Sequence, residues 1–188
     1  MTLSGRPLRA DALRNREALV AVARAAFSVS TRAVPLEDIA RDAGVGIGTL
    51  YRHFPSREAL VEVVYAVELD DVVSKATTLL AELAPEPALR AWMRHYAEFS
   101  MMKRGIIDTL QAGWASGRTA TPATRERISS AIGGILMAGA SNGSLRSDIA
   151  SDDVTTMVLG VVLSTGPTAP RAQLERLFDL LVDGLVRR

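Results

Sequence analysis

The chain has 188 residues, of which 48% are hydrophobic, and its formal net charge is +1. This length and composition predict a folded protein with a substantial core and exclude an intrinsically disordered chain. The sequence contains no Cys, which excludes disulfides, thiolate metal ligands and a Cys nucleophile. No apolar run approaches the roughly 18 residues of a membrane span, and the first residues lack the apolar core of a signal peptide, so we expect a cytoplasmic protein without a membrane partner.

Positive charge is concentrated near the N-terminus. Residues 1–58 contain nine Arg and six acidic residues, a net charge of +3, whereas the remaining residues contain 13 Lys or Arg and 15 acidic residues, a net charge of −2. Binding to nucleic-acid phosphates requires an excess of this sign, although the excess is small and is weak support by itself.

Residues 1–10 contain Gly, Pro and two Arg, and we expect them to form a flexible arm. Arg6 suits a contact with phosphates or with a minor groove, and a solvated tail is an equally good interpretation. Over residues 11–30, apolar side chains recur at spacings of three and four, which predicts the first helix.

The segment Leu36–Phe54 (LEDIARDAGVGIGTLYRHF) contains two short helical patterns that meet at a turn. Gly44 suits the left-handed residue that a tight turn needs. In the second pattern, Ile47, Leu50 and Phe54 fall on one face, and Gly48, Thr49, Arg52 and His53 fall on the other. A helix that is anchored on one side and polar on the other is typical of a helix-turn-helix that reads DNA. The alternative is an ordinary helical hairpin buried in a larger protein.

Two glycine-containing patterns resemble a phosphate-binding loop and a catalytic nucleophile motif, but the predicted secondary structure around them excludes both. Residues 44–48 look superficially like a phosphate-binding loop, but they follow a helix rather than a strand. Residues 139–143 match the nucleophile pattern G-x-S-x-G, but a predicted helix precedes them, and both His residues come before the serine. We therefore interpret residues 139–143 as a helix end with a turn. We expect no catalytic residues, no enzyme activity, no cofactor and no metal site.

The sequence pattern over residues 56–114 predicts a long helix followed by a cluster of aromatic side chains. Ser56 suits the N-cap of a helix that extends to about residue 83. Further helices are expected over residues 87–102 and 103–114. Aromatic and other large apolar side chains gather there and can line an apolar ligand cavity: Trp92, Tyr96, Phe99, Met102, Ile106, Leu110 and Trp114, with Met137 from the next helix. Ordinary core is the alternative, and it is favoured for any single residue.

The last third of the chain predicts helices over residues 122–140, 151–165 and 171–186. The last two are unusually apolar for helices at the periphery of a monomer. Their apolar faces have to be buried either within the chain or against a partner.

The chain resembles the TetR family of bacterial transcriptional regulators over about residues 12–60. The resemblance is carried by Phe27, Ile39-Ala40, Ala43-Gly44-Val45, Gly48-Thr49-Leu50-Tyr51, His53-Phe54 and Arg57-Glu58-Ala59-Leu60. It implies an all-α fold with a three-helix DNA-binding bundle in residues 1–55 and a larger helical domain for ligand binding and dimerisation in residues 56–188, about nine helices in all.

The resemblance also implies roles for individual residues. Thr49, Tyr51 and His53 would contact phosphates, and Gly48 would allow the backbone to approach closely. Arg52 would contact a base, and Arg57 would hold a phosphate where Lys is usual in the family. The ring of Tyr51 has a competing role in core packing.

The chain departs from the family at two places. Val34 and Pro35 stand where a hydroxyl residue is usual. Gly46 and Ile47 replace the usual polar residues at the beginning of the recognition helix. Ile47 can contact a thymine methyl group or pack inward.

The resemblance further implies a homodimer, with a purely intramolecular core as the alternative. The expected interface residues on the last two helices are Val154, Val158, Val161, Val162, Leu174, Phe178, Leu181 and Leu185. The expected function is that of a repressor that binds a palindromic operator in double-stranded DNA and is released by a small apolar or cationic effector. The alternative is a helical protein-interaction module that has lost DNA binding.

Overall fold

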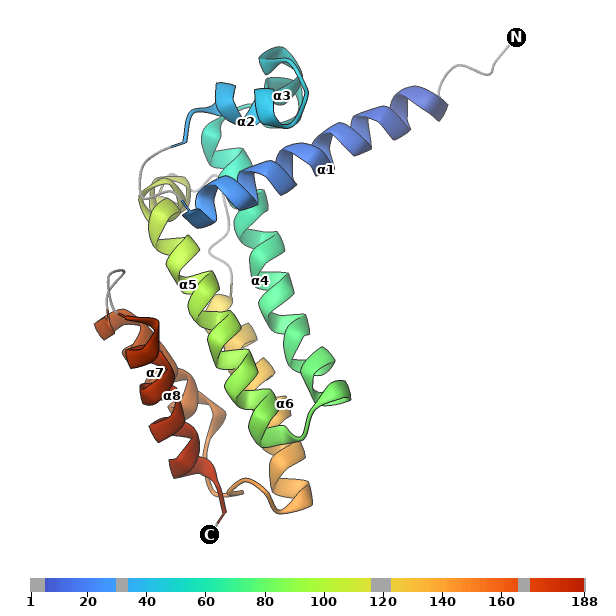
Figure 1. Cartoon of the computed structure of the whole chain (residues 1–188). Helices are drawn as coiled ribbons and strands as arrows, with labels where there is room; N and C mark the ends of the chain where they lie inside the picture. The colour runs from blue at the N-terminus through green and yellow to red at the C-terminus, as the bar shows by residue number, and fades with distance from the viewer. Residues whose placement is uncertain (1–5, 30–33, 116–122, 166–169, 188) are drawn as a thin grey trace. The chain divides into compact units, whose positions relative to one another are not determined.

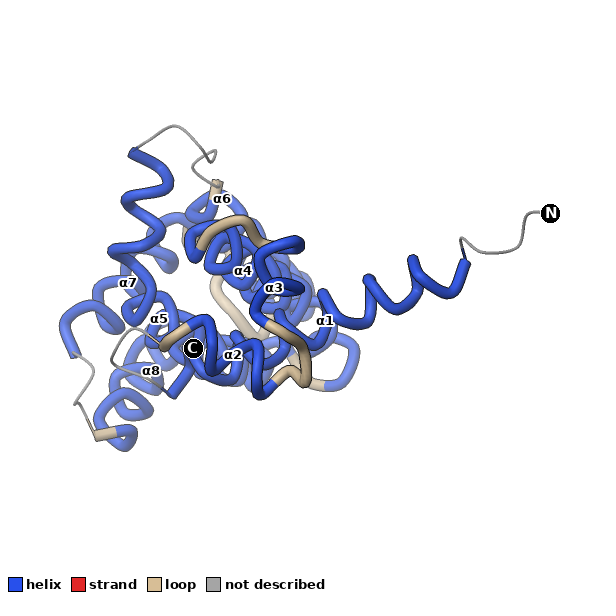
Figure 2. The backbone as a smooth tube through the Cα atoms, turned by 90° about the horizontal axis from the view of Figure 1, so that it is seen from above, coloured by secondary structure: helices blue, strands red, loops and turns tan. Residues whose placement is uncertain are grey.

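The computed structural model describes residues 6–29, 34–115, 123–165 and 170–187, apart from the side chains of residues 6–9, 29, 104 and 112–115. The regular elements in these residues are helices, as the sequence predicts (Figures 1 and 2). They are α1 (Arg6–Val29), α2 (Leu36–Asp42), α3 (Ile47–His53), α4 (Arg57–Glu82), α5 (Pro85–Ala115), α6 (Thr124–Asn142), α7 (Ser151–Thr165) and α8 (Arg171–Leu185). None of the described helices combines the length and the apolar character that crossing a membrane requires.

The chain divides into two compact units. Unit 1 consists of residues 1–67 and 102–121, and unit 2 consists of residues 68–101 and 122–188. Helices α4 and α5 each contribute residues to both units. A functional division of the chain at residue 55 stays a prediction.

Unit 1 is built around the packing of α1 against α2 and α3. Most of the apolar positions predicted from the sequence are buried here: Leu19, Ala23 and Phe27 on α1, Leu36, Ile39 and Ala40 on α2, and Leu50 and Phe54 at α3. The exceptions are Leu13 on α1 and Ile47 on α3, which are 61% and 37% exposed. Gly44 has a φ of 70°, the left-handed conformation expected of it. The turn is closed by a hydrogen bond from the Val45 amide to the Ala40 carbonyl, at 2.9 Å. The Ser56 hydroxyl accepts a hydrogen bond from the Ala59 amide at 3.3 Å, which confirms the predicted cap of α4.

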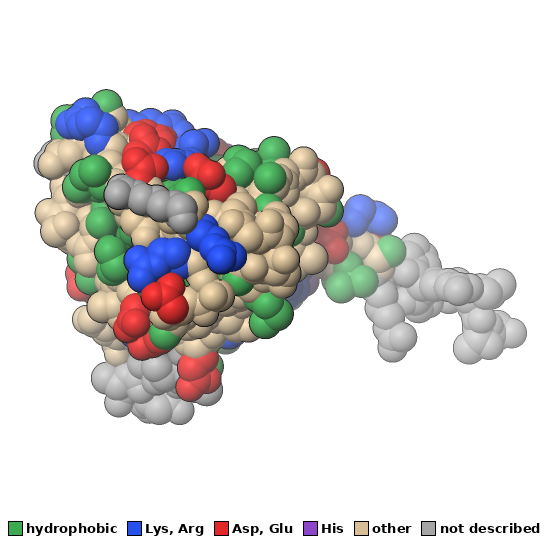
Figure 3. Space-filling model, turned by 90° about the horizontal axis from the view of Figure 1, so that it is seen from below, with side chains coloured by type: hydrophobic (Ala, Val, Ile, Leu, Met, Phe, Trp, Pro, Cys, Tyr) green, Lys and Arg blue, Asp and Glu red, His purple; other side chains and the backbone are tan. Residues whose placement is uncertain are grey.

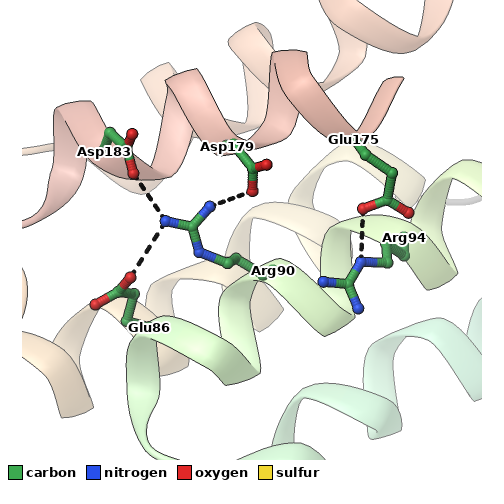
Figure 4. Close-up of polar contacts among 6 residues, drawn as sticks. All are labelled: Glu86, Arg90, Arg94, Glu175, Asp179 and Asp183. Carbon is green, nitrogen blue, oxygen red and sulfur yellow. Dashed lines mark hydrogen bonds and ion pairs between the residues drawn. The ribbon is translucent and has the colours of Figure 1, made fainter. Parts of the chain in front are cut away.

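In unit 2, α7 packs against both α6 and α8. The indole Nε1 of Trp92 on α5 donates to the carbonyl of Val72 on α4, at 2.9 Å. Ion pairs join α5 to α8: Arg90 contacts Asp179 and Asp183, and Arg94 contacts Glu175 (Figure 4).

The end of α8 is fastened to the turn that follows α6. The Arg146 amide donates to the Leu185 carbonyl at 2.9 Å, and the Arg187 amide donates to the Ser144 carbonyl at 3.2 Å. Between these two bonds, the side chain of Leu145 is only 1% exposed. The segment after α6 therefore belongs to the core of unit 2.

Two helix boundaries differ from the prediction. Helix α1 begins at Arg6, so residues 6–10 are helical rather than part of a flexible arm. Residues 87–114 lie in one continuous helix, α5, instead of two. Gly105 does not end it, because a glycine weakens a helix by only about 1 kcal/mol and the next turns bury Ile106 and Leu110.

Residues 139–143 form the predicted helix end with a turn. Helix α6 runs through Asn142, and Gly143 caps it in the left-handed conformation, with a φ of 77°. Gly139 lies within the helix against Leu145. A helix in place of the strand that a nucleophile elbow needs excludes that motif here.

The predicted dimer-interface residues differ in how far the single chain buries them, and their role in an interface stays a prediction. Six of the eight are buried within the single chain: Val154, Val158, Val162, Phe178, Leu181 and Leu185. Val161 and Leu174 are half-buried. An apolar stripe indicates that a helix face is buried but not which chain buries it, and here the same chain does so. The same two helices expose the large apolar side chains Met157, Leu163 and Leu180.

Candidate nucleic-acid interface

Helix α3 is anchored to unit 1 from one side. Leu50 is completely buried and Phe54 is 2% exposed. The guanidinium carbon of Arg16, on α1, lies 5.4 Å from the centre of the Phe54 ring. These contacts fix the rotation of α3 about its own axis and thereby decide which side chains face outward.

The outward side of α3 carries the polar residues predicted from the sequence. Gly48, Tyr51 and Arg52 are exposed, and Thr49 and His53 are half-buried. The Tyr51 side chain is 46% exposed, so its ring is not part of the core. Hydroxyl, imidazole and guanidinium groups are therefore brought together on one short helix, and all of them donate hydrogen bonds to phosphate oxygens.

Two exposed arginines on α2 and α3 differ in their ion pairs with carboxylates. Arg41 on α2 forms ion pairs with Asp38 at 2.7 Å and with Asp42 at 3.2 Å. Its hydrogen bond to Asp38, followed by the attraction of the two carboxylates, raises the pKa of Arg41 above its ordinary value. Arg52 has no ion pair within the part of the chain that the structure describes. Arg52 is therefore the cation on these helices that a nucleic acid reaches without displacing a carboxylate.

Arg57 has contacts within the protein that sequence reasoning did not anticipate. Its guanidinium donates to the carbonyl of Val34 and lies 5.7 Å from the centre of the Phe27 ring. These contacts give Arg57 a structural role alongside the phosphate contact predicted for it. The predicted contact of Arg6 lies outside the described side chains.

Gly46 is the N-cap of α3, and Gly48 lies in its first turn. A Cβ atom at either position would meet no atom within 4 Å from another described part of the chain, and neither glycine has a positive φ. Ile47 between them is 37% exposed, so it does not pack fully inward. The beginning of α3 is thus an open and sterically accessible part of the interface.

The predicted ligand-pocket residues fall into both units. Trp92, Tyr96 and Phe99 are buried in unit 2, where the Trp92 and Tyr96 rings stack with their centres 5.5 Å apart. Met102, Ile106 and Leu110 are buried in unit 1, and the side chain of Trp114 lies outside those described. Burial of this kind is common to pocket walls and to ordinary core, so the pocket stays a prediction.

Met137, also predicted to line the pocket, differs from these residues in its exposure. It is 71% exposed on α6. The buried face of α6 carries Ile128, Ile132, Ile135, Leu136 and Gly139, and Met137 lies off that stripe. Met137 therefore lacks the burial of the other predicted residues, and its contact with a ligand stays a prediction.

Charge elsewhere on the described surface is mixed in sign. On the face seen in Figure 3, acidic side chains lie next to basic ones. Arg146 on the loop after α6, for example, pairs with Asp148 at 2.8 Å. The described residues contain no group of three or more His, Asp or Glu arranged to hold a metal ion.

Comparisons with known proteins cover most of the chain. Residues 19–64 match the family described as bacterial regulatory proteins, tetR family, and residues 84–187 match the C-terminal domain described as transcriptional regulator SbtR-like. A curated regulator of the HTH type from Staphylococcus aureus is 22% identical over 108 residues. The chain spans 58% and 25% of the lengths of the two curated relatives that it matches.

Two solved structures are similar over almost their whole length. A TetR transcriptional regulator from Streptomyces coelicolor is 43% identical, with a TM-score of 0.82 over 92% of this chain and 98% of that one. A TetR transcription regulatory protein from Mycobacterium vanbaalenii is 32% identical, with a TM-score of 0.73 over 96% of this chain and 99% of that one. With both parts of its sequence matched and its fold shared with these two proteins, the chain belongs to the TetR family of bacterial transcriptional regulators.

Proposed function

We propose that this protein is a repressor that binds a palindromic operator in double-stranded DNA as a homodimer and is released by a small effector. The observation that carries the proposal is the two-sided character of α3. Leu50 and Phe54 anchor the helix through its buried side. The guanidinium of Arg52, which has no ion pair among the described residues, lies on the outward side with Thr49 and Tyr51. A recognition helix needs these two properties to enter a major groove in a fixed orientation.

The polar residues of α3 have two roles in DNA binding, contact with phosphates and contact with bases. Thr49, Tyr51 and His53 supply donors to phosphates, which position the protein without reading sequence. Arg52 can bond a guanine through two parallel hydrogen bonds, which reads sequence directly. Affinity and specificity therefore depend on different side chains of the same helix.

Dimerisation supplies the second recognition helix. A two-fold dimer reads two half-sites whose centres are about 34–36 Å apart, in successive major grooves. The exposed apolar side chains Met157, Leu163 and Leu180 on α7 and α8 support a contact with a second copy.

Release by an effector requires a ligand that binds one conformer better than another. The buried aromatic residues Trp92, Tyr96 and Phe99 suit a small apolar or cationic molecule, since aromatic faces attract both. Binding of such a molecule would lower DNA affinity by the coupling energy between the two sites.

The test begins with selection of bound sequences from random duplexes, followed by affinity measurements by fluorescence anisotropy. We expect an inverted repeat to be selected and affinity to fall steeply between about 50 and 200 mM salt. Arg52→Ala should lose about 1–3 kcal/mol of discrimination at one base position. Thr49→Ala should weaken binding to all sequences by a similar factor. Failure to select any sequence, or affinity that is independent of salt, would reject the proposal.

The alternative function is a protein-interaction module. Exposed Ile47 and Tyr51 on α3 give it some support, because apolar surface also suits a protein partner. The same selection separates the two functions: a module that has lost DNA binding selects no sequence.

A further inference from the structure

We propose that Ile47 reads the C5-methyl group of a thymine in the operator and that Gly46 and Gly48 give the base access to it. The inference rests on the proposed DNA-binding function and deepens it, because it names a chemical feature of the operator that this helix reads.

The first observation is that Ile47 is exposed on a helix whose other aliphatic side chain is buried. Leu50 is completely buried, whereas Ile47 is 37% exposed. Tyr51, four residues after Ile47 and therefore on the same row of the helix, is 46% exposed. The outward side of α3 thus presents a continuous apolar row beside its polar residues.

The second observation is that the Cβ positions of the two glycines that flank Ile47 are open among the described residues. Gly46 has a φ of −72°, which any residue adopts. A Cβ atom at Gly46 or Gly48 would meet no atom within 4 Å from another described part of the chain. Glycine inside a helix is less favourable than alanine, so the chain gives up stability at Gly48 without gaining space for another part of itself. A binding partner that approaches the backbone closely on both sides of Ile47 would use the space that the missing side chains of both glycines leave open.

The surroundings of Ile47 indicate what that partner is. The same short helix also carries Thr49, Arg52 and His53, and Arg52 is free of carboxylate partners among the described residues. A surface of this composition favours a polyanion over an apolar protein face. The apolar row is therefore expected to lie against the bases of the DNA whose phosphates these side chains hold.

Thymine is the base that an isoleucine can read. In the major groove, each base pair presents hydrogen-bond donors and acceptors, and thymine adds a methyl group. Isoleucine has no donor or acceptor, so it cannot distinguish the polar groups. Contact with the methyl group is the remaining way in which it can contribute sequence preference.

The experiment removes only that methyl group. In the operator selected with the wild-type chain, each thymine is replaced in turn by deoxyuridine, symmetrically in both half-sites, and binding is measured by fluorescence anisotropy. At one symmetric position we expect about a four-fold loss of affinity per methyl group, as for burial of one methylene-sized group, and about a fifteen-fold loss for both half-sites together. Replacement at the other positions should change affinity little.

Variants then assign the methyl contact to Ile47. Ile47→Ala should bind the thymine duplex more weakly and lose the preference for thymine over deoxyuridine at that position. Ile47→Val, which keeps the branched side chain and disturbs folding least, should show an intermediate preference. Thr49→Ala is the matched control on the same helix: it should bind both duplexes more weakly and keep the wild-type ratio between them.

The possible failures are distinguishable. Salt-dependent binding with equal affinity for thymine and deoxyuridine at every position would overturn the inference and leave the DNA-binding function intact. An unchanged preference in Ile47→Ala and Ile47→Val would assign the methyl contact to another residue and would also overturn it. Absence of any selected sequence would reject the DNA-binding function, and this inference with it.

Discussion

The guanidinium of Arg57 donates a hydrogen bond to the backbone carbonyl of Val34. This contact joins the first residue of α4 to the segment that precedes α2. The same guanidinium lies over the ring of Phe27 near the end of α1. One side chain therefore ties together three segments of unit 1, and a phosphate contact by Arg57 would use the donors that these contacts leave free.

Arg57→Lys should separate the structural role from the phosphate role. Lysine keeps the positive charge but cannot donate to a carbonyl and cover a ring with a planar group at the same time. We expect unfolding stability to fall by about 1–2 kcal/mol, while affinity for the selected duplex changes little. Urea unfolding and fluorescence anisotropy measure the two effects. Unchanged stability together with a large loss of affinity would contradict the structural role.

Gly48→Ala should stabilise the protein and weaken its binding to DNA. Alanine is favoured over glycine in a helix by up to about 1 kcal/mol, and the added Cβ would meet no atom within 4 Å from another described part of the chain. The same Cβ would occupy space that the DNA needs in the proposed complex. Gly134→Ala on α6 is the matched control, because it is also exposed and helical with open space at its Cβ. It should raise stability equally and leave affinity unchanged.

Gly139→Ala should have the opposite effect on stability. A Cβ at Gly139 would lie 2.4 Å from Cδ1 and 2.5 Å from Cγ of Leu145. Leu145 is 1% exposed and cannot move away freely, so we expect a loss of about 1–3 kcal/mol in urea unfolding. Combining Gly139→Ala with Leu145→Ala should cost less than the sum of the two single substitutions, because the smaller side chain removes the clash.

Arg90→Gln should destabilise the contact between α5 and α8 more than Arg94→Gln does. Arg90 pairs with Glu86, Asp179 and Asp183, whereas Arg94 pairs with Glu175 (Figure 4). Burial lowers the pKa of Arg90, but its hydrogen bonds to Asp183 and Glu86 and the attraction of Asp179 outweigh that effect and raise it.

Loss of Arg90 leaves three carboxylates close together without their cation. The carboxylates are largely exposed, so water limits the cost to about 1–2 kcal/mol. Loss of Arg94, whose side chain is 46% exposed, should cost below about 1 kcal/mol. Equal effects in urea unfolding would show that the clustering of acids around Arg90 has no energetic consequence.

The sequence predicted the helix-turn-helix of unit 1 well, because helical periodicity and turn geometry depend on residues that are close together in the sequence. The positions of Leu36, Ile39, Leu50 and Phe54 follow helical periodicity, and Gly44 follows from the steric demands of a left-handed turn. Contacts between distant segments were not predictable in this way. The hydrogen bond from Arg57 to Val34 joins residues 23 positions apart, and no helical or turn pattern in the sequence predicts it.

The sequence was also unable to assign the apolar faces of α7 and α8. Val158 and Leu181 satisfy the periodicity of a dimer interface and that of an internal core equally well. The structure buries both within one chain. Residues that stay exposed, such as Leu180, could be recognised only after the internal packing was known.

Leu180→Glu should therefore disrupt the proposed homodimer without unfolding the chain. Leu180 is 70% exposed on α8, so a charge there costs the single chain little but would be buried unpaired in a dimer. Size-exclusion chromatography with light scattering should give the mass of one chain, with an unchanged helical circular dichroism spectrum. Leu13→Glu, at a site on α1 that is 61% exposed, is the control and should stay dimeric.

Val158→Asp tests the alternative interface. Val158 belongs to the apolar face that the sequence predicts as the dimer interface, whereas Leu180 belongs to the exposed face. Val158 is fully buried within the chain, and an unpaired carboxylate there should lower unfolding stability by several kcal/mol, on the order expected for a buried charge. Unfolding of this variant alongside a folded, monomeric Leu180→Glu would assign dimerisation to the exposed face. A folded, monomeric Val158→Asp alongside a dimeric Leu180→Glu would return the interface to the residues predicted from the sequence.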